Sequence, residues 1–456
     1  MLRVAVIGSG PSGVYTAQSL IEQEAVPDIE VYVLDRLPCP YGLVRYGVAP
    51  DHEKIKSLQN NLRTVLEHPR VRFVGNVEAG APGLGVEELR KIFDAVVFCV
   101  GAATDRHLGI PGEDLPGSHP ATEFVAWYSA HPDAAATRFA LTARSAVVIG
   151  VGNVAVDVTR MLSRAAAELA ATDMPQGPLG ALADSRVEDV WMVGRRGPSQ
   201  AKFTTKELRE LGSLPGTEVL VRPDELALDP AYRDPADLPA VARRNVQVLR
   251  GWAEQPAGGG APVGRRRRIH LRFFLRPVEI LGDVGGVRAV RFERTAPDGR
   301  GGVAGTGRFE EIEAQLVLRS VGYRGTPQPG LPFDEATGTV PHTAGRVLQD
   351  GAPLPGVYVA GWIKRGPTGV IGTNRPCAKE TAQSLLADAA TLAGRATAGD
   401  PVAALARAGQ QPVLWPGWLA IEAAEAEWGQ GLGRGTVKLP DWAGLLEAAR
   451  AADLTR

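Results

Sequence analysis

Residues 3–13 read Arg-Val-Ala-Val-Ile-Gly-Ser-Gly-Pro-Ser-Gly, and this stretch decides the fold. The apolar run Val4 to Ile7 predicts a buried parallel strand. It leads directly into Gly8-x-Gly10-x-x-Gly13, and residues 14–24 then have helical periodicity. A strand, a glycine turn and a helix in this order are typical of a dinucleotide-binding unit. The alternative interpretation is a structural turn in another kind of α/β protein.

The residues of this turn have separate expected tasks. Gly8 allows the sharp turn, Gly10 lets the backbone approach a pyrophosphate, and Gly13 lets the helix pack closely on the strand. The helix start, which includes Ser12, offers free N–H groups and a positive dipole end to the phosphates. A second strand over residues 29–34 ends at Asp35, roughly 20 residues past the glycines, where an acid usually binds ribose hydroxyls.

A second copy of this pattern begins near residue 145. Residues 145–149 predict a strand, Gly150-Val-Gly152-Asn-Val-Ala155 a glycine turn, and residues 154–169 a helix. The next predicted strand, residues 189–193, ends in Gly194-Arg195-Arg196-Gly197. Two such units indicate two nucleotide sites, or an internal duplication with one inactive copy.

The two strand ends differ in charge, and this difference distinguishes the cofactors. An acid such as Asp35 pairs with a free 2′-hydroxyl and repels a 2′-phosphate. Arg195 and Arg196 would do the reverse, through charge-assisted and often bidentate hydrogen bonds. The first site therefore suits the adenosine of FAD or NAD, and the second suits NADP. A solvated basic turn is the alternative for the arginines.

Size and composition restrict the class of protein. The chain has 456 residues, enough for two or three domains, and a formal net charge of −1, so nothing global attracts nucleic acid or an anionic membrane. No apolar stretch is long enough to span a membrane, and a first strand at residue 3 leaves no room for a signal peptide unless one was removed. The three cysteines form no C-x-x-C, which argues against disulfides and against a metal site. We expect a cytoplasmic protein.

Several other segments carry weaker predictions. Residues 253–264 predict a loop, and the run Arg265 to Arg268 allows a nucleic-acid interpretation, although a solvated strand edge is preferred. Residues 271–280, 287–293 and 314–321 predict strands of a β-rich addition to the second domain. The C-terminal residues predict a packed extension that contains four tryptophans: Trp415, Trp418, Trp428 and Trp442.

Three longer motifs resemble the adrenodoxin reductase-type ferredoxin–NADP(+) reductases, a family of mitochondrial and actinobacterial flavoproteins. The first is Pro40-Tyr41-Gly42-Leu43-Val44-Arg45 with Gly47-Val48-Ala49-Pro50-Asp51-His52. The second is Gly194-Arg195-Arg196-Gly197-Pro198, and the third runs from Gly361-Trp362-Ile363-Lys364-Arg365 to Gly369-Val370-Ile371. The resemblance covers nearly the whole chain.

The resemblance implies an α/β fold with two Rossmann-like, three-layer dinucleotide-binding domains in a glutathione-reductase-like arrangement. The NADP domain, residues 106–320, would be inserted into a FAD domain made of residues 1–105 and 321–456. It implies FAD contacts from the first glycine turn and from Asp35, Leu43, Val77, Trp362, Gly369, Val370 and Ile371. It implies NADP contacts from Arg106, Gly150, Gly152, Asn153, Val154, Ala155, Val156, Arg195, Arg196, Glu207 and Gly369.

Two polar residues, His52 and Glu207, match residues near the nicotinamide and flavin in this family. They are the candidates for proton handling or nicotinamide positioning. For His52 the alternative is a loop residue satisfied by a backbone bond, and for Glu207 a solvated helix carboxylate. The chain departs from the family at Asp35, where glutamate is usual, and at the helix after Asn374, where Arg-Pro-Cys-Ala replaces the usual text.

The implied reaction passes a hydride from NADPH to FAD and then single electrons to an iron–sulfur ferredoxin. Ferredoxins are usually acidic, so Arg243, Arg244 and Arg265 to Arg268 are candidates for a basic docking face, and we expect a monomer or weak dimer. A flavin disulfide reductase is set aside because no redox cysteine pair lies near either turn. Two rivals stay open: a flavin-dependent NADPH oxidase or monooxygenase, and an electron-entry subunit of a larger complex.

Overall fold

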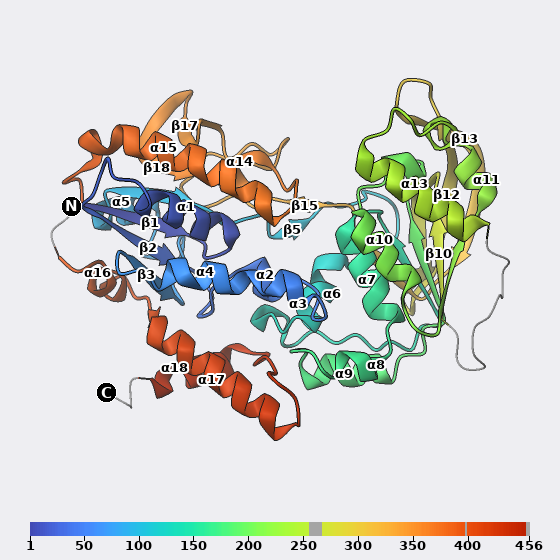
Figure 1. Ribbon diagram of the computed structural model, residues 1–456, viewed down its shortest axis with the longest axis horizontal. Coiled ribbons are helices and arrows are strands. Elements are labelled where there is room, and N and C mark those ends of the chain that lie inside the picture. The colour runs from blue at the N-terminus through green and yellow to red at the C-terminus, as the bar shows by residue number, and fades with distance from the viewer. Residues whose placement is uncertain (255–266, 397–398, 453–456) are drawn as a thin grey trace. The chain divides into compact units, whose positions relative to one another are not determined.

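The chain divides into two units, each of which contains one large sheet, and it crosses between them four times (Figure 1). The computed structural model describes residues 1–254, 267–396 and 399–452. The first unit comprises residues 1–104, 129–135 and 323–456, and the second comprises 105–128 and 136–322. The predicted boundaries lie between residues 105 and 106 and between residues 320 and 321, one and two residues from the observed ones. The first unit also includes residues 129–135, which the prediction placed in the second. The first crossing lies in β5 (Thr104–Asp105) and the last immediately before β15 (Tyr323–Arg324), and these two strands pair. The other two crossings lie at the two ends of residues 129–135.

The first unit is built on a sheet of eight strands in the order β16-β17-β18-β4-β1-β2-β3-β19. Its five central strands are parallel, and β16, β17 and β19 run antiparallel to their neighbours. The strands are β1 (Leu2–Ile7), β2 (Ile29–Leu34), β3 (Val71–Gly75), β4 (Ala95–Phe98), β16 (His342–Thr343), β17 (Arg346–Gln349), β18 (Ala352–Val359) and β19 (Val413–Leu414).

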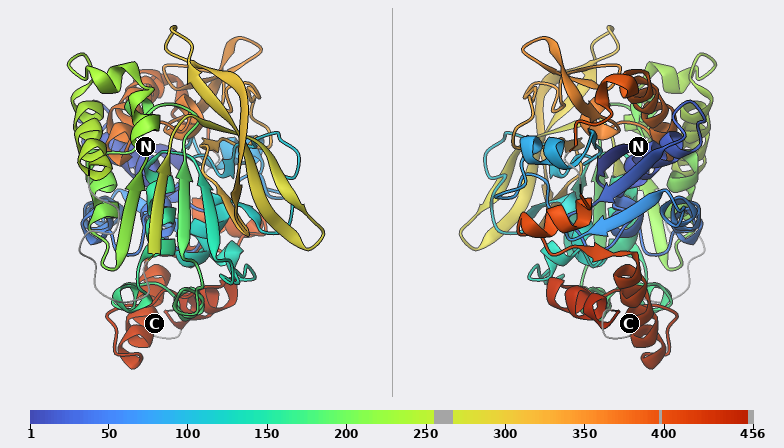
Figure 2. Two further views of the ribbon diagram at one scale, coloured as in Figure 1. Left: turned by 90° about the vertical axis from the view of Figure 1, so that its right-hand side faces the viewer. Right: turned by 90° about the vertical axis from the view of Figure 1, so that its left-hand side faces the viewer.

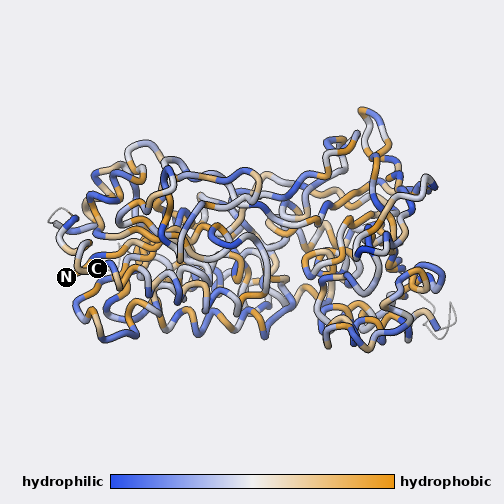
Figure 3. Tube along the Cα trace, turned by 90° about the horizontal axis from the view of Figure 1, so that it is seen from above, coloured by the Kyte–Doolittle hydropathy of each residue, from blue (hydrophilic) through white to orange (hydrophobic). Residues whose placement is uncertain are grey.

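Alternating apolar residues bury both faces of this sheet, as expected for parallel strands. Val4 and Val6 of β1 join one apolar cluster, whereas Ala5 and Ile7 join the cluster on the other face. Figure 3 shows hydrophobic residues concentrated in the interior of each unit.

Helices α1 (Pro11–Ile21), α4 (Leu58–Leu66) and α15 (Asn374–Leu392) cover the first face of this sheet, and α5 (Val86–Ile92) and α16 (Pro401–Arg407) cover the second. The sequence of residues 54–66 predicts a single helix, but the structure interrupts it at Ser57, between α3 (Glu53–Lys56) and α4. The remaining helices are α2 (Leu43–Tyr46), η1 (Pro132–Ala134), α14 (Trp362–Arg365), η3 (Ile371–Thr373), α17 (Trp415–Gly431) and α18 (Trp442–Ala451).

The second unit has a parallel six-stranded sheet in the order β6-β14-β7-β8-β10-β9, seen face-on in the left view of Figure 2. A three-stranded antiparallel sheet, β11-β12-β13, packs through apolar residues against one face of the six-stranded sheet. The strands are β6 (Ser118–Pro120), β7 (Ser145–Ile149), β8 (Asp189–Val193), β9 (Thr217–Val221), β10 (Arg267–Arg272), β11 (Leu275–Asp283), β12 (Gly286–Pro297), β13 (Val303–Glu313) and β14 (Leu316–Arg319).

The helices of the second unit include α7 (Asn153–Ser163), α10 (Thr205–Gly212) and α13 (Ala240–Ala253), which pack together beside the parallel sheet. The predicted helix over residues 154–169 is broken at Arg164, where the backbone is extended. The others are α6 (Ala121–Tyr128), α8 (Ala166–Leu169), α9 (Gln176–Ala183), η2 (Pro198–Gln200), α11 (Pro223–Ala227) and α12 (Pro230–Arg233).

Two strand predictions in this unit were wrong in detail. The strand expected over residues 271–280 is two strands, because the chain turns at Phe273 and Phe274; β10 belongs to the parallel sheet and β11 to the β-rich addition. Arg267 and Arg268 begin β10, which pairs with β8 on one side and β9 on the other, so they do not lie on an edge strand. The predicted loop from 255 onward, with Arg265 and Arg266, lies outside the described residues.

Candidate nucleotide-binding sites

The first glycine turn connects β1 to α1 within the first unit. Gly8 has a φ of +106°, and a Cβ added there would lie 2.6 Å from the carbonyl oxygen of Cys99. A Cβ at Gly13 would lie 1.8 Å from the carbonyl oxygen of Gly8. At Gly10 the nearest atom would be the Cα of Gly42, 3.8 Å away. The protein itself therefore requires glycine at positions 8 and 13, whereas the space beside Gly10 is open, as a pyrophosphate at the start of a helix needs.

Asp35 follows β2 and is tied to the first glycine turn by hydrogen bonds. Its Oδ2 accepts from the backbone N–H of Ser9 at 2.8 Å and from the Ser9 hydroxyl at 2.5 Å, and its Oδ1 accepts from the N–H of Leu37 at 2.9 Å. Burial raises the pKa of the Asp35 carboxyl, and the bonds from Ser9 and Leu37 oppose that rise. Oδ1 has a lone pair left for a ribose hydroxyl, since a carboxylate offers about four acceptor positions.

The segment after Asp35 approaches the same turn in an unusual backbone conformation. Tyr41 has a φ of +83° and Gly42 a φ of +50°, and the N–H of Tyr41 donates to the carbonyl of Ser9 at 3.1 Å. Left-handed conformation at an aromatic residue is strained and persists where the surroundings hold it. Leu43 is exposed at the start of α2, and Val77 is buried in the apolar cluster on the far face of the sheet.

The conformation of this segment is held by the C-terminal helices. Trp418 of α17 meets the Tyr41 ring edge-on with centroids 5.9 Å apart. The buried Arg45 donates to Glu425 at 2.5 Å, and the buried Lys438 donates to the carbonyl oxygen of Arg45 at 2.6 Å. Sequence reasoning placed the C-terminal tryptophans in a packed extension but missed Glu425, because a single acid in a helix gives no signal of a buried partner 380 positions away.

The third motif forms the turn after β18. Gly361 has a φ of +78°, and a Cβ there would lie 2.4 Å from the Oγ of Ser12. The indole N–H of Trp362 is buried and has no hydrogen-bond partner among the described residues. The Arg365 guanidinium bonds to Thr368, Thr373 and Asn374, and so it holds the exposed segment that contains Gly369, Val370 and Ile371.

The second glycine turn, in the second unit, has the same geometry as the first. Gly150 has a φ of +142°, and a Cβ there would lie 2.1 Å from the carbonyl oxygen of Ser320. Around Gly152, at the N-terminus of α7, nothing lies within 4 Å of an added Cβ. The third position is Ala155, which is fully buried with Val156. The Oδ1 of Asn153 accepts the backbone N–H of Thr204 at 2.8 Å, so this side chain connects the turn to α10.

Arg195 and Arg196 follow β8 with their side chains available. Arg195 is exposed and Arg196 is partly exposed, and neither guanidinium has an acidic partner among the described residues. Neighbouring arginines are engaged: Arg268 contacts Asp189 at 2.6 Å, and Arg272 contacts Glu225 at 2.7 Å. The pair therefore presents positive charge that no protein carboxylate neutralises, as binding of a 2′-phosphate requires.

The two candidate catalytic residues belong to different units. His52 is a buried residue of the first unit at the N-terminus of α3, and its carbonyl oxygen accepts the N–H groups of Ile55 and Lys56. Glu207 is a buried residue of the second unit in the first turn of α10, whose capping residue Thr204 accepts the N–H of Glu207. Arg106 is exposed in the second unit, and its N–H donates to the carbonyl oxygen of Gly322 at 2.9 Å.

Comparison with known proteins gives the same two-site architecture. The family model described as pyridine nucleotide-disulphide oxidoreductase matches residues 2–193. The NADPH-ferredoxin reductase FprA of Mycobacterium tuberculosis is 44% identical over 461 residues, covering 97% of this chain and 98% of the relative. The mitochondrial NADPH:adrenodoxin oxidoreductase of Arabidopsis thaliana is 38% identical and covers 98% of this chain and 95% of the relative. The chain belongs to the FprA/adrenodoxin reductase family.

Solved structures of this family agree with the fold over its whole length. Mycobacterium tuberculosis FprA in complex with NADPH superposes with a TM-score of 0.90 at 43% identity, covering 98% of this chain and 99% of that one. The predicted fold class, two dinucleotide-binding α/β units, is thereby confirmed. Among the described residues, no helix combines the length and apolarity needed to cross a membrane.

The residues present fit the two cofactors that this family architecture implies. Gly10 and Gly152 leave the open approach that a pyrophosphate needs, and the Trp362 N–H is a buried donor without a protein partner. Arg195 and Arg196, which have no acidic partner in the part of the chain that the structure describes, offer positive charge for a phosphate at the second turn. The three cysteines, Cys39, Cys99 and Cys377, are buried and free, so no disulfide of a disulfide reductase is formed.

Proposed function

We propose that this chain is an NADPH–ferredoxin reductase that uses FAD to pass electrons from NADPH to an iron–sulfur protein. The observation that carries the proposal is the pair of glycine turns with opposite strand ends, acidic at Asp35 and dibasic at Arg195 and Arg196, in a chain that belongs to this family over nearly its full length. FAD binds the first unit and NADPH the second.

The residues of each turn hold one nucleotide. Gly10 and the N–H groups at the start of α1 receive the FAD pyrophosphate, while Asp35 and Ser9 face its ribose. Gly152 with the start of α7 receives the pyrophosphate of NADPH, and Arg195 and Arg196 bind its 2′-phosphate. When bound, FAD supplies chemistry that the side chains lack, because it can take two electrons as a hydride and release them singly.

Leu43, Val77, Trp362, Gly369, Val370 and Ile371 complete the proposed FAD site, and Arg106 and Gly369 add to the NADPH site. His52 and Glu207 position the nicotinamide or handle protons. Anaerobic stopped-flow reduction of the flavin by NADPH tests this role. We expect His52→Ala and Glu207→Ala to slow flavin reduction, and wild-type rates in both variants would leave these residues structural.

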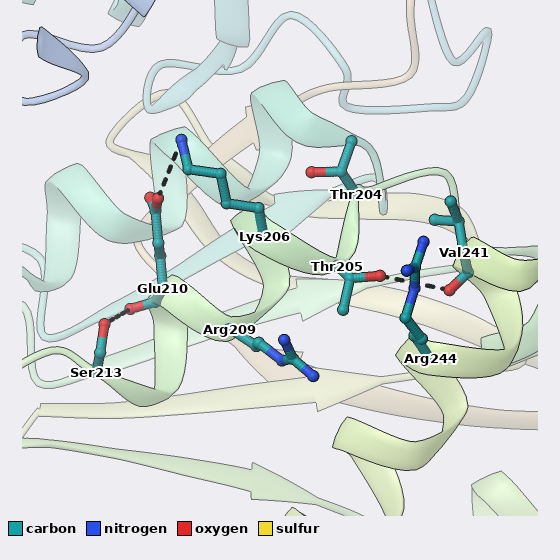
Figure 4. Close-up of a pocket in the computed structure, with 8 residues that line it drawn as sticks. All are labelled: Thr204, Thr205, Lys206, Arg209, Glu210, Ser213, Val241 and Arg244. Carbon is teal, nitrogen blue, oxygen red and sulfur yellow. Dashed lines mark hydrogen bonds and ion pairs between the residues drawn. The ribbon is translucent and has the colours of Figure 1, made fainter. Parts of the chain in front are cut away.

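The ferredoxin docks on a basic face of the second unit, formed by α10 and α13. Lys206, Arg209, Arg243 and Arg244 are exposed there. Lys206, Arg209 and Arg244 line an open pocket together with Thr204, Thr205 and Ser213 (Figure 4). Glu210 is the acid at this pocket; it pairs with Lys206 at 3.7 Å and with Arg160 at 3.5 Å. Arg209 and Arg244 have no acidic partner among the described residues, so this face attracts an acidic protein.

Arg267 and Arg268, also considered for docking, are engaged within the unit. Arg267 donates to the carbonyl oxygen of Arg164 at 2.7 Å, and Arg268 pairs with Asp189. We therefore assign the docking face to α10 and α13. The protein acts in the cytoplasm, where its three thiols stay reduced.

The experiment that tests the function follows electrons from NADPH to an acceptor. The purified protein should be yellow and should lose this colour anaerobically with NADPH. An acidic ferredoxin should then be reduced, as followed through cytochrome c, with a rate that falls steeply as the salt concentration rises.

The double variant Arg209→Glu with Arg244→Glu tests the docking face. It should raise the KM for ferredoxin and leave ferricyanide reduction unchanged. A colourless protein that cannot be reconstituted with FAD would contradict the proposal, and oxygen consumption without ferredoxin reduction would favour an oxidase or monooxygenase.

A further inference from the structure

The backbone of the dibasic turn, residues 194–197, is hydrogen-bonded to the β-rich addition and to the residue that precedes it. The carbonyl oxygen of Arg195 accepts the hydroxyl of Thr295, on β12, at 2.8 Å. The carbonyl oxygen of Arg196 accepts the N–H of Phe274, which precedes β11, at 3.2 Å. Both peptide groups that carry the arginine side chains are therefore bonded to the antiparallel sheet.

These two donors are connected to each other. The N–H of Thr295 donates to the carbonyl oxygen of Phe274 at 2.8 Å, and Phe274 has a φ of +58°. The pairing of β12 with β13 shifts register between Glu293 and Thr295, where an irregularity re-aims side chains. Thr295 is 2% exposed and Phe274 3%. A strained turn and a strand irregularity thus meet on the two arginine carbonyls. Of the two residues that donate to these carbonyls, Thr295 does so through its side-chain hydroxyl and Phe274 through its backbone N–H.

The rest of the turn is bonded just as closely. The N–H of Gly194 donates to Arg272 at 2.9 Å, and Leu275 donates to Gly194 at 3.1 Å. Asp229, which is buried, accepts the N–H of Ser199 at 2.9 Å. Within the described residues the two guanidinium groups have no acidic partner, while their backbone is fixed. In this arrangement the arginine side chains lose less conformational entropy when they bind a ligand.

We infer that Thr295 is a positioning residue for cofactor choice, because its hydroxyl sets the direction in which Arg195 meets the 2′-phosphate of NADPH. This inference rests on the proposed function of the second turn. Thr295 does not touch the nucleotide, and its effect is confined to the group that distinguishes NADPH from NADH.

The test compares Thr295→Val, which keeps the branched shape and removes the hydroxyl, with Thr295→Ser, which keeps the hydroxyl. The holoenzyme is titrated with 2′,5′-ADP, which carries the 2′-phosphate, and with 5′-AMP, which lacks it. We expect Thr295→Val to weaken 2′,5′-ADP binding roughly fivefold to tenfold, the effect of one hydrogen bond, and to leave 5′-AMP binding unchanged. The KM for NADPH should rise with kcat unchanged, and Thr295→Ser should restore both.

Thr306→Val is the matched control, because the Thr306 hydroxyl donates to the carbonyl oxygen of Arg294 on the same antiparallel sheet but on its exposed side. It should bind both ligands as the wild type does. The pair Thr295→Ala and Thr295→Ser repeats the comparison without a branched side chain, so a folding defect of the valine variant leaves the test intact.

The outcomes separate this inference from the proposed function. If Arg195→Ala loses preference for 2′,5′-ADP and the Thr295 variants without a hydroxyl do not, the inference is wrong and the function stands. Equal weakening of both ligands by Thr295→Val would make the residue merely structural and would also overturn the inference. If Arg195→Ala and Arg196→Ala keep the wild-type preference, the assignment of the second turn to NADPH falls, and the inference falls with it.

Discussion

The two glycine turns have the same mechanical design and opposite electrostatics. In each, the first glycine has a positive φ and would press a Cβ against a backbone carbonyl oxygen, of Cys99 for Gly8 and of Ser320 for Gly150. In each, the second glycine leaves open space. The strand ends differ, because Asp35 is bonded within its own turn whereas Arg195 and Arg196 have no acidic partner among the described residues. Under the proposed function, the backbone sets where a pyrophosphate binds, and the strand end sets which nucleotide is accepted.

The largest expected effect comes from removing the positive charge of Arg195 and Arg196, which distinguishes the second turn from the first. Each charged hydrogen bond to the 2′-phosphate contributes roughly 1.5–3 kcal/mol, so Arg195→Ala or Arg196→Ala should lower kcat/KM for NADPH at least about tenfold. The double variant should lose roughly a hundredfold or more if the two effects add. NADH kinetics, measured in parallel, should change little. Unaltered NADPH kinetics in both single variants would remove the assignment of this turn to NADPH.

The next largest effect tests whether the second glycine of each turn leaves space for a pyrophosphate. An added Cβ would make only an ordinary contact with Gly42 at Gly10 and would meet nothing within 4 Å at Gly152, so any clash would be with the bound nucleotide. Gly10→Ala should therefore release FAD, and Gly152→Ala should raise the KM for NADPH. An overpacking cost of about 1–3 kcal/mol corresponds to roughly tenfold in each case. Flavin content and NADPH kinetics measure the two effects separately.

The first glycines are the contrast for this prediction. Gly8→Ala and Gly150→Ala should lower the melting temperature of the protein with or without nucleotide, since their clashes are with the chain itself. If Gly10→Ala destabilised the apoprotein as strongly as Gly8→Ala, the two glycines would not have separable roles.

A smaller effect concerns the acidic strand end. Ser9→Ala removes one of the two donors to Asp35 Oδ2, and we expect it to weaken FAD binding by roughly 1 kcal/mol. Asp35→Asn should weaken it further. Neither variant should alter the preference for NADPH over NADH, which depends on the other strand end. A changed preference would show that the two turns are not independent.

The smallest effect is the pH dependence of Asp35 in the apoprotein. Burial raises the pKa of this carboxyl above its ordinary value, so its contribution to stability is present at acid pH and is lost as pH rises through the folded-state pKa. The melting temperature of the wild type relative to Asp35→Asn should therefore increase as pH falls from 7 toward 4. Melting curves of the two apoproteins at several pH values measure this, and a constant difference would contradict it.

Local patterns predicted much of the fold. The strands at residues 29–34, 145–149 and 189–193 have the expected bounds, because their apolar runs and the turn residues that follow them are strong local signals. The breaks at Ser57 and at Phe273–Phe274 have no such signal. The strand β13 was missed because most of its residues are exposed and polar, so alternation does not mark it.

The sequence predicted those residues of the candidate site that belong to a short motif. It did not predict the residues that contact them from distant parts of the chain. The glycines, Asp35 and the two arginines stand beside predicted strands. The groups that hold them do not: Glu425 reaches Arg45, and Thr295 reaches Arg195, across separations of 380 and 100 residues. Only packing brings such pairs together, and single threonine or glutamate residues are too common to indicate it. The roles of His52 and Glu207 remain predictions.

The second unit begins and finishes at neighbouring points, since the N–H of Arg106 donates to the carbonyl oxygen of Gly322 at 2.9 Å. An inserted domain with such closely spaced ends adds almost no loop-closure entropy to its host. The same feature makes residues 105–322 a replaceable segment: a dinucleotide module of different coenzyme preference could be joined at its two ends without lengthening either connection, provided that it keeps residues 129–135, which belong to the first unit. Changes of coenzyme during the descent of such proteins therefore need not disturb the flavin-binding half.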